Sequence, residues 1–112
     1  MKRARLALAA LALLAAPVAV AQLDGSGTIT TGGTSQQVFD VRPGRAYLFC
    51  QNPIAATETL FVNAPTVAGT TNGSYELAPG GAITFAGGGF VPTGQVFVTA
   101  ATTGHRFVCK QG

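Results

Sequence analysis

The sequence has few of the residues on which enzyme and metal chemistry depends. Its 112 residues include one histidine (His105), two cysteines, one methionine and no tryptophan, with only seven basic and four acidic residues. A blue-copper site needs two histidines and a cysteine, and a catalytic zinc site usually has histidine among three protein ligands. The composition therefore predicts no metal site. For His105 it favours a partly exposed position on a strand.

Catalytic motifs are missing as well. The sequence has no Gly-x-Ser-x-Gly elbow, and Ser26, Ser35 and Ser74 all lie in or beside turn residues. The four carboxylates are scattered and form no pair at a spacing typical of glycoside hydrolysis. The run Gly87-Gly88-Gly89 lacks the Lys-Ser/Thr that completes a phosphate loop, so it predicts a turn or bulge. We expect a protein that is not an enzyme and uses no cofactor.

The N-terminus has the three-part layout of a secretory signal peptide. A basic start is followed by an apolar stretch from Leu6, by Pro17 and by the small residues Ala19-Val20-Ala21. We predict that residues 1–21 are removed by cleavage before Gln22 and that the protein is exported to the periplasm or beyond. The alternative is a membrane anchor. The apolar stretch of about 16 residues is short of the roughly 20 that span a bilayer, so we expect no membrane association after cleavage.

The predicted mature chain, residues 22–112, has no net charge. It keeps four basic and four acidic residues: Arg42, Arg45, Arg106, Lys110, Asp24, Asp40, Glu58 and Glu76. Nucleic-acid binding is driven by the neutralisation of phosphates, so this balance argues against a DNA or RNA partner. Low charge suits a protein held in an assembly, and it equally suits an all-β extracellular fold.

Hydrophobic periodicity predicts short strands throughout residues 22–112, which we expect to form one domain. The run Arg45–Pro53 is rich in aromatic and apolar residues and is bounded by turns, and we expect it to be the central strand. The segment Gln22–Gly33 is either an edge strand or a flexible arm. Further strands are expected at Ser35–Val41, Thr57–Asn63, Ser74–Ala78, Ala82–Ala86, Gln95–Ala100 and His105–Lys110. Seven or eight short strands and no helical period predict a small antiparallel β-sandwich, jelly-roll-like, or a small barrel.

The two cysteines are expected to form a disulfide in an exported chain. Along a strand, Cys50 shares a face with Leu48, and Cys109 shares a face with Phe107. Both thiols are therefore expected to point into one core and to join the central strand to the last. The alternative is a pair of free buried thiols.

Three of the expected strands carry apolar residues on both faces. If their aliphatic residues point inward, then Phe49, Phe61 and Phe97 point outward, where a monomeric sandwich normally has polar residues. We predict self-association, or docking on a larger assembly, through a surface that contains Tyr47, Phe49, Phe61 and Phe97. The alternative is that loops cover some of these strands on both sides.

Four segments together resemble the small virion proteins of tailed phages and prophages. They are Arg45-x-Tyr47-Leu48-x-x-Gln51-Asn52, Leu60-Phe61-Val62-Asn63, Glu76-Leu77-Ala78-Pro79-Gly80-Gly81 and Val91-Pro92-Thr93-Gly94. The resemblance covers most of residues 27–112 and implies a non-enzymatic β-sandwich of a virion that decorates the capsid or tail. The signal peptide and the cysteine pair depart from that family. The second interpretation is therefore an exported binding module that attaches to a cell-surface, matrix or secreted partner.

Overall fold

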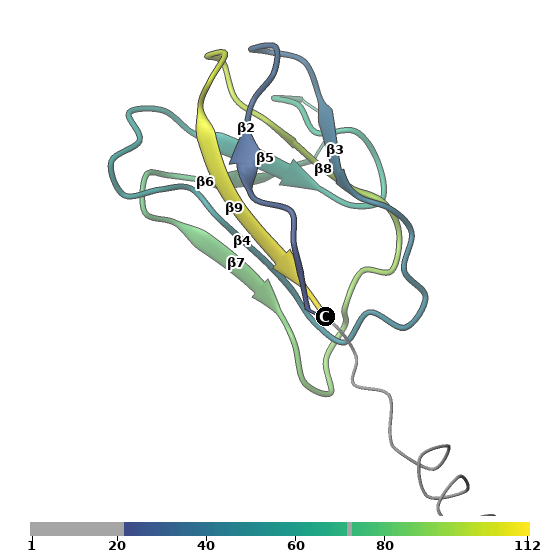
Figure 1. Ribbon diagram of the computed structural model, residues 1–112. Coiled ribbons are helices and arrows are strands. Elements are labelled where there is room, and N and C mark those ends of the chain that lie inside the picture. The colour runs from purple at the N-terminus through teal and green to yellow at the C-terminus, as the bar shows by residue number, and fades with distance from the viewer. Residues whose placement is uncertain (1–21, 72) are drawn as a thin grey trace, which may run out of the picture.

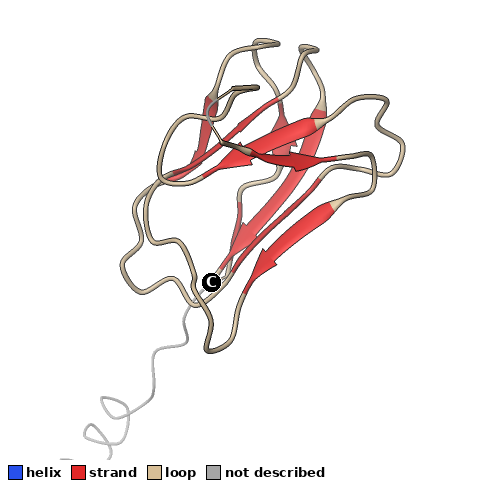
Figure 2. Cartoon of the chain, turned by 180° about the vertical axis from the view of Figure 1, so that it is seen from behind, coloured by secondary structure: helices blue, strands red, loops and turns tan. Residues whose placement is uncertain are grey.

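The computed structural model describes residues 22–71 and 73–112, and the predicted signal peptide lies outside these residues. The described part contains strands and loops but no helix, and the strands form two packed antiparallel sheets (Figures 1 and 2). The strands are β1 (Leu23–Asp24), β2 (Gly27–Thr28), β3 (Gln36–Phe39), β4 (Leu48–Gln51), β5 (Leu60–Asn63), β6 (Tyr75–Leu77), β7 (Ala82–Phe85), β8 (Val96–Thr99) and β9 (Arg106–Gln111). The predicted all-β sandwich is confirmed.

The strand order is that of a jelly roll. The first sheet has the order β1-β9-β4-β7, with β2 also paired to β9, and the second sheet has the order β3-β8-β5-β6. β1 and β2 run along the same neighbour on either side of Gly25 and Ser26, so they act as one interrupted strand. Counting them as one gives eight strands in two four-stranded sheets, with most connections crossing between the sheets. This interruption is why the structure has nine strands where seven or eight were expected.

The core lies between the sheets and is filled by alternate residues of the inner strands. Val, Leu and aromatic residues favour strands because their side chains pack well on a pleated surface. The inward residues include Leu48 and Cys50 of β4, Leu60 and Val62 of β5, Val96 and Val98 of β8, and Phe107 and Cys109 of β9. This alternation is the one that the sequence predicted for β4 and β9.

The predicted central strand is shorter than expected. β4 begins at Leu48 rather than Arg45, and the preceding residues Ala46 and Tyr47 bond to the backbone of Gly112, which follows β9. β4 does lie between β9 and β7, so it is an inner strand, as expected (Figure 1).

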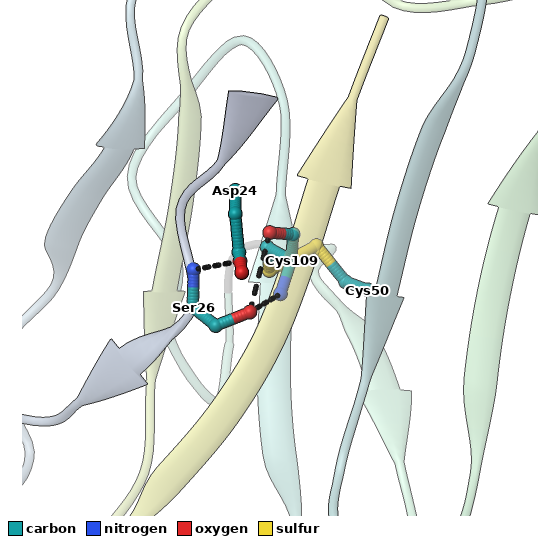
Figure 3. The surroundings of a disulfide bond; sticks show 4 residues. All are labelled: Asp24, Ser26, Cys50 and Cys109. Atoms are coloured by element: carbon teal, nitrogen blue, oxygen red, sulfur yellow. Dashed lines mark hydrogen bonds between the residues drawn. A yellow bond between two sulfur atoms is a disulfide. The ribbon is translucent and has the colours of Figure 1, made fainter. Parts of the chain in front are cut away.

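Cys50 and Cys109 form a disulfide between two neighbouring strands of the same sheet. Their Cα atoms are 4.2 Å apart, which is typical of a directly opposed antiparallel pair that exchanges no backbone hydrogen bonds. The backbone of Cys109 bonds instead to its other neighbour. Its carbonyl accepts from the amide of Gly25 at 2.9 Å. Its amide donates to Ser26 Oγ at 3.1 Å, as Figure 3 shows. The predicted bridge is confirmed, and it fits an oxidising environment.

Arg45 is a buried cation that joins three segments of the chain. Only 4% of the residue is exposed, and no carboxylate bonds to it. Its Nε donates to Gln111 Oε1 at 2.7 Å, Nη1 donates to the carbonyls of Pro92 and of Gly94 (3.0 Å), and Nη2 donates to the Asp40 carbonyl at 3.0 Å. Burial, with a smaller contribution from nearby Arg42, lowers the pKa of the Arg45 guanidinium. Arg45 therefore stabilises this end of the sandwich through neutral acceptors.

Within residues 22–71 and 73–112, no helix has the length and apolar character needed to cross a bilayer.

Candidate functional site

A hollow of the described surface lies between the loop that follows β4 and the turn that precedes β9. It has a volume of ≈ 330 Å³. Because β4 and β9 are antiparallel neighbours, the end of β4 lies beside the start of β9, and the two loops face each other there. Residues 53 and 55–58 line one side, and residues 102–106 line the other. The only ionisable groups in this lining are Glu58, His105 and Arg106.

His105 is partly exposed as a residue, as expected, but its side chain is enclosed in this cleft. It lies immediately before β9, and only 7% of its side chain is exposed. Its Nδ1 lies 3.0 Å from Glu58 Oε1, and its Nε2 lies 2.8 Å from Asn52 Oδ1. The ring is buried because two polar partners satisfy both of its nitrogens.

The hydrogen bonds around Asn52 define which atoms donate to which. Asn52 Nδ2 donates to the carbonyls of Glu58, at 2.8 Å, and Leu77, at 2.9 Å, so its Oδ1 must be the atom that faces His105. Oδ1 is an acceptor, and therefore His105 Nε2 donates to it. The other ring nitrogen faces a carboxylate oxygen, which is also an acceptor. Both ring nitrogens of His105 therefore face hydrogen-bond acceptors.

Glu58 completes the cluster on the other side. Its Oε1 also accepts from the amide of Thr102 at 3.1 Å, and its Oε2 accepts from Thr102 Oγ1 at 3.1 Å. Both carboxylate oxygens and both ring nitrogens are thus already bonded within the protein. The cluster fastens the loop after β4 to the turn before β9.

The described residues include no group of three or more histidine, cysteine, aspartate or glutamate side chains that could hold a metal ion. His105 and Glu58 bond to each other, and their other hydrogen bonds join His105 to Asn52 and Glu58 to Thr102. The cluster thus lacks the three-ligand constellation of a catalytic zinc site.

The four aromatic residues predicted to form one interface are divided between the two sheets. Phe49 is on β4, where it alternates with the inward Leu48 and Cys50, and Tyr47 has the same parity just before the strand. Phe61 and Phe97 alternate with inward residues of β5 and β8, which belong to the other sheet. The two pairs therefore lie on opposite outer faces, and each of the four side chains is half-buried.

A loop lies beside the outer face that carries Phe61. Residues 69–71 and Phe61 line the same hollow, and the amide of Ala68 donates to Ser35 Oγ at 2.9 Å, just before β3. Ala68 is buried although it belongs to a loop. This arrangement agrees with the alternative in which loops cover outward aromatic residues, at least for Phe61. Whether any of the four residues contacts a partner stays a prediction.

The structure contains an aromatic cluster that the sequence analysis did not identify. Tyr75 of β6 and Phe85 of β7 are in edge-to-face contact with ring centroids 5.7 Å apart, and Phe85 makes a similar contact with Phe90 at 6.3 Å. Phe90 is 76% exposed and Tyr75 is 43% exposed. β6 and β7 are edge strands of different sheets, so these rings lie where the core reaches the surface. The only signal in the sequence was Phe90 standing alone after three glycines.

No family model, curated protein or solved structure matches this chain. The proposals below therefore depend on the geometry and chemistry of this chain.

Proposed function

We propose that this protein is a non-enzymatic structural protein that associates with other proteins through the surface of its sandwich, as virion proteins of phages do on a capsid or tail. The observation that carries the proposal is the exposure of large apolar side chains on a domain without net charge. These side chains are Leu23, Val41, Ile54, Val67, Tyr75 and Phe90. Apolar side chains that gather on a surface, as Tyr75 and Phe90 do around Phe85, mark interaction sites.

The polar cleft supports an association role rather than catalysis. Its histidine and carboxylate bond to each other, to Asn52 and to Thr102, so they hold loops in place. The jelly-roll architecture adds support by analogy, since it recurs in viral capsid domains and in lectin domains. This support is at the level of fold alone, because one fold serves many functions.

The second candidate is an exported binding module that attaches to a cell-surface, matrix or secreted partner. The buried Cys50–Cys109 disulfide favours it, because disulfides persist in oxidising compartments and virion proteins assemble in the reducing cytoplasm. The predicted signal peptide points to the same compartment. Under this interpretation the domain is released before Gln22 and works outside the cytoplasm.

Fractionation of the producing cells separates the two candidates. The full chain is expressed from its own locus, and culture supernatant, periplasm, cytoplasm and purified phage particles are probed with an antibody. A virion protein is found at fixed stoichiometry on particles after a density gradient. An exported module is found in the periplasm or supernatant with its N-terminus at Gln22. Protein that is monomeric, free of every partner and absent from particles refutes an association function.

A further inference from the structure

The two sheets leave four strand edges without a neighbour within the described chain. They are the interrupted β1/β2 edge and β7 in the first sheet, and β3 and β6 in the second. An open edge displays backbone amides and carbonyls that pair readily with another strand, so soluble proteins usually protect it with charge, bulges or shortness.

Three of the four edges have such protection. β1 and β2 are two residues each and include Asp24, and β3 has a register shift between Gln37 and Phe39. β6 is three residues long with Glu76 at its centre. β7 differs: Ala82-Ile83-Thr84-Phe85 pairs with β4 in continuous register and has no charged residue. The whole stretch 77–104 lacks acidic and basic residues.

The alternation of the β4–β7 ladder determines which backbone groups of β7 face outward. Because Cys50 is in a pair that exchanges no hydrogen bonds with β9, its amide and carbonyl point to the other neighbour, Ile83 of β7. The bond from the Asn52 amide to the Gly81 carbonyl, at 2.9 Å, follows the same alternation. The amides and carbonyls of Ala82 and Thr84 therefore point away from the sheet. Among the described residues they have no hydrogen-bond partner.

Exposed aromatic rings flank this free backbone. Phe85 packs against the core, and the rings of Tyr75 and Phe90 each contact it edge to face. We refer to Ala82–Phe85 together with Tyr75 and Phe90 as the β7 edge surface. It combines unpaired backbone groups, which specify an extended strand as the partner, with apolar contacts that such a strand would bury.

We propose that the β7 edge surface pairs with the same surface of a second copy of this chain. An isologous contact brings identical groups together across a two-fold axis, so an edge that carries charge opposes its own pairing. β7 is the one edge of the described sheets that has neither a charge nor a break in register. Residues 22–112 have no net charge, so the two copies do not repel each other as a whole. This inference rests on the proposed association function and names its surface and partner.

The outward groups define the register of the pair. With Ile83 opposite Ile83 of the second copy, Ala82 of each copy lies opposite Thr84 of the other. Both residues direct amide and carbonyl toward the new neighbour, so two fully bonded pairs form. The β1-β9-β4-β7 sheet then continues through β7 into the sheet of the second copy.

The test is sedimentation velocity of the protein exported and processed by a host that expresses the full chain, over about three decades of concentration. The wild type is expected to shift from monomer to dimer. Thr84→Lys places like charges on diagonal neighbours across the two-fold axis, and we expect it to weaken dimerisation at least tenfold. The matched control is Gln37→Lys, which adds the same charge to an exposed position of the protected β3 edge and should dimerise like the wild type.

Hydrogen exchange of the wild-type protein provides a second readout that needs no variant, in case Thr84→Lys does not fold. The amides of Ala82 and Thr84 should exchange slowly at dimer concentrations and rapidly on dilution. If the wild type dimerises but Thr84→Lys dimerises equally well, or if both amides exchange rapidly in the dimer, the β7 edge surface is not the contact. Either result leaves the proposed association function standing. A wild type that stays monomeric throughout overturns the second copy as the partner. Binding of other proteins or particles then decides separately whether the association function holds.

Discussion

Replacing Arg45 by methionine tests how much of the stability of this domain depends on a buried guanidinium. Methionine fills similar space but donates no hydrogen bond. It therefore leaves four acceptors without their donor: Gln111 Oε1 and the carbonyls of Asp40, Pro92 and Gly94. Each buried acceptor left unsatisfied costs about 1–3 kcal/mol, and removal of the buried cation returns part of that cost. We expect a net loss of about 3–5 kcal/mol. A domain of this size has roughly 5–14 kcal/mol in total, so the loss is a large fraction of its stability.

Urea unfolding of the oxidised protein, followed by circular dichroism, measures this loss. A change of this size also lowers the melting temperature by at least about 12 °C. Arg45→Lys keeps the positive charge but cannot reproduce the planar fork, so its unfolding free energy should fall between those of the wild type and Arg45→Met. Arg106→Met is the matched control, because Arg106 is exposed, and it should change stability by less than about 0.5 kcal/mol. If Arg45→Met is within about 1 kcal/mol of the wild type, the four bonds do not stabilise the fold and the reasoning is refuted.

Three further predictions concern the disulfide, the cleft and the N-terminal strand. The Cys50–Cys109 bridge joins residues 59 positions apart, so its loss should lower the free energy of unfolding in urea by about 4 kcal/mol. The bridge is reduced in denaturant and the protein is refolded with reductant; equal unfolding midpoints for the oxidised and reduced forms would contradict this. His105→Leu leaves Glu58 Oε1 and Asn52 Oδ1 without the ring, so it should cost about 1–3 kcal/mol in the same assay, whereas Thr57→Val, at an exposed position of the same cleft, should cost almost nothing; equal effects would argue against the cluster as a fastener. Hydrogen bonds from Ser26, first from its side chain and to a smaller extent from its amide, lower the pKa of Asp24. Ionised Asp24 therefore stabilises the fold above its unfolded pKa of about 3.9. This contribution is lost as the pH falls through the lower pKa of the folded state. A carboxyl NMR titration should therefore show a higher midpoint for Asp24 in Ser26→Ala, and an unchanged midpoint would falsify this assignment.

The fold class could be predicted from the sequence because it depends on local patterns. Strand alternation placed Leu48 with Cys50 and Phe107 with Cys109, and the only possible cysteine pairing then linked β4 to β9. The sheet to which a strand belongs depends instead on contacts between distant segments. Alternation shows that Phe49 and Phe61 point away from the core, but it does not show that β4 and β5 are in different sheets. The predicted single interface was divided for this reason.

The polar side chains inside the fold were beyond prediction for a related reason. Arg45 lies in a run that reads as a strand, and three of its four acceptors are carbonyls, which every residue has. His105 and Glu58 are 47 positions apart, and neither is part of a recognisable motif. The lone histidine was expected to be partly exposed on a strand, and the enclosure of its ring depends on partners that only the folded chain brings together. The aromatic cluster around Phe85 also depends on two strands from different sheets.

The position of β9 has a consequence for how the chain acquires its structure. β9 follows the other described strands along the chain, yet it lies between β4 and the β1/β2 strand and contributes Cys109 to the bridge. Until residues 106–111 take their place, β4 and the β1/β2 strand of the first sheet lack the neighbour that lies between them. Completing this sheet pairs segments that are distant along the chain, and such pairing is typically slow.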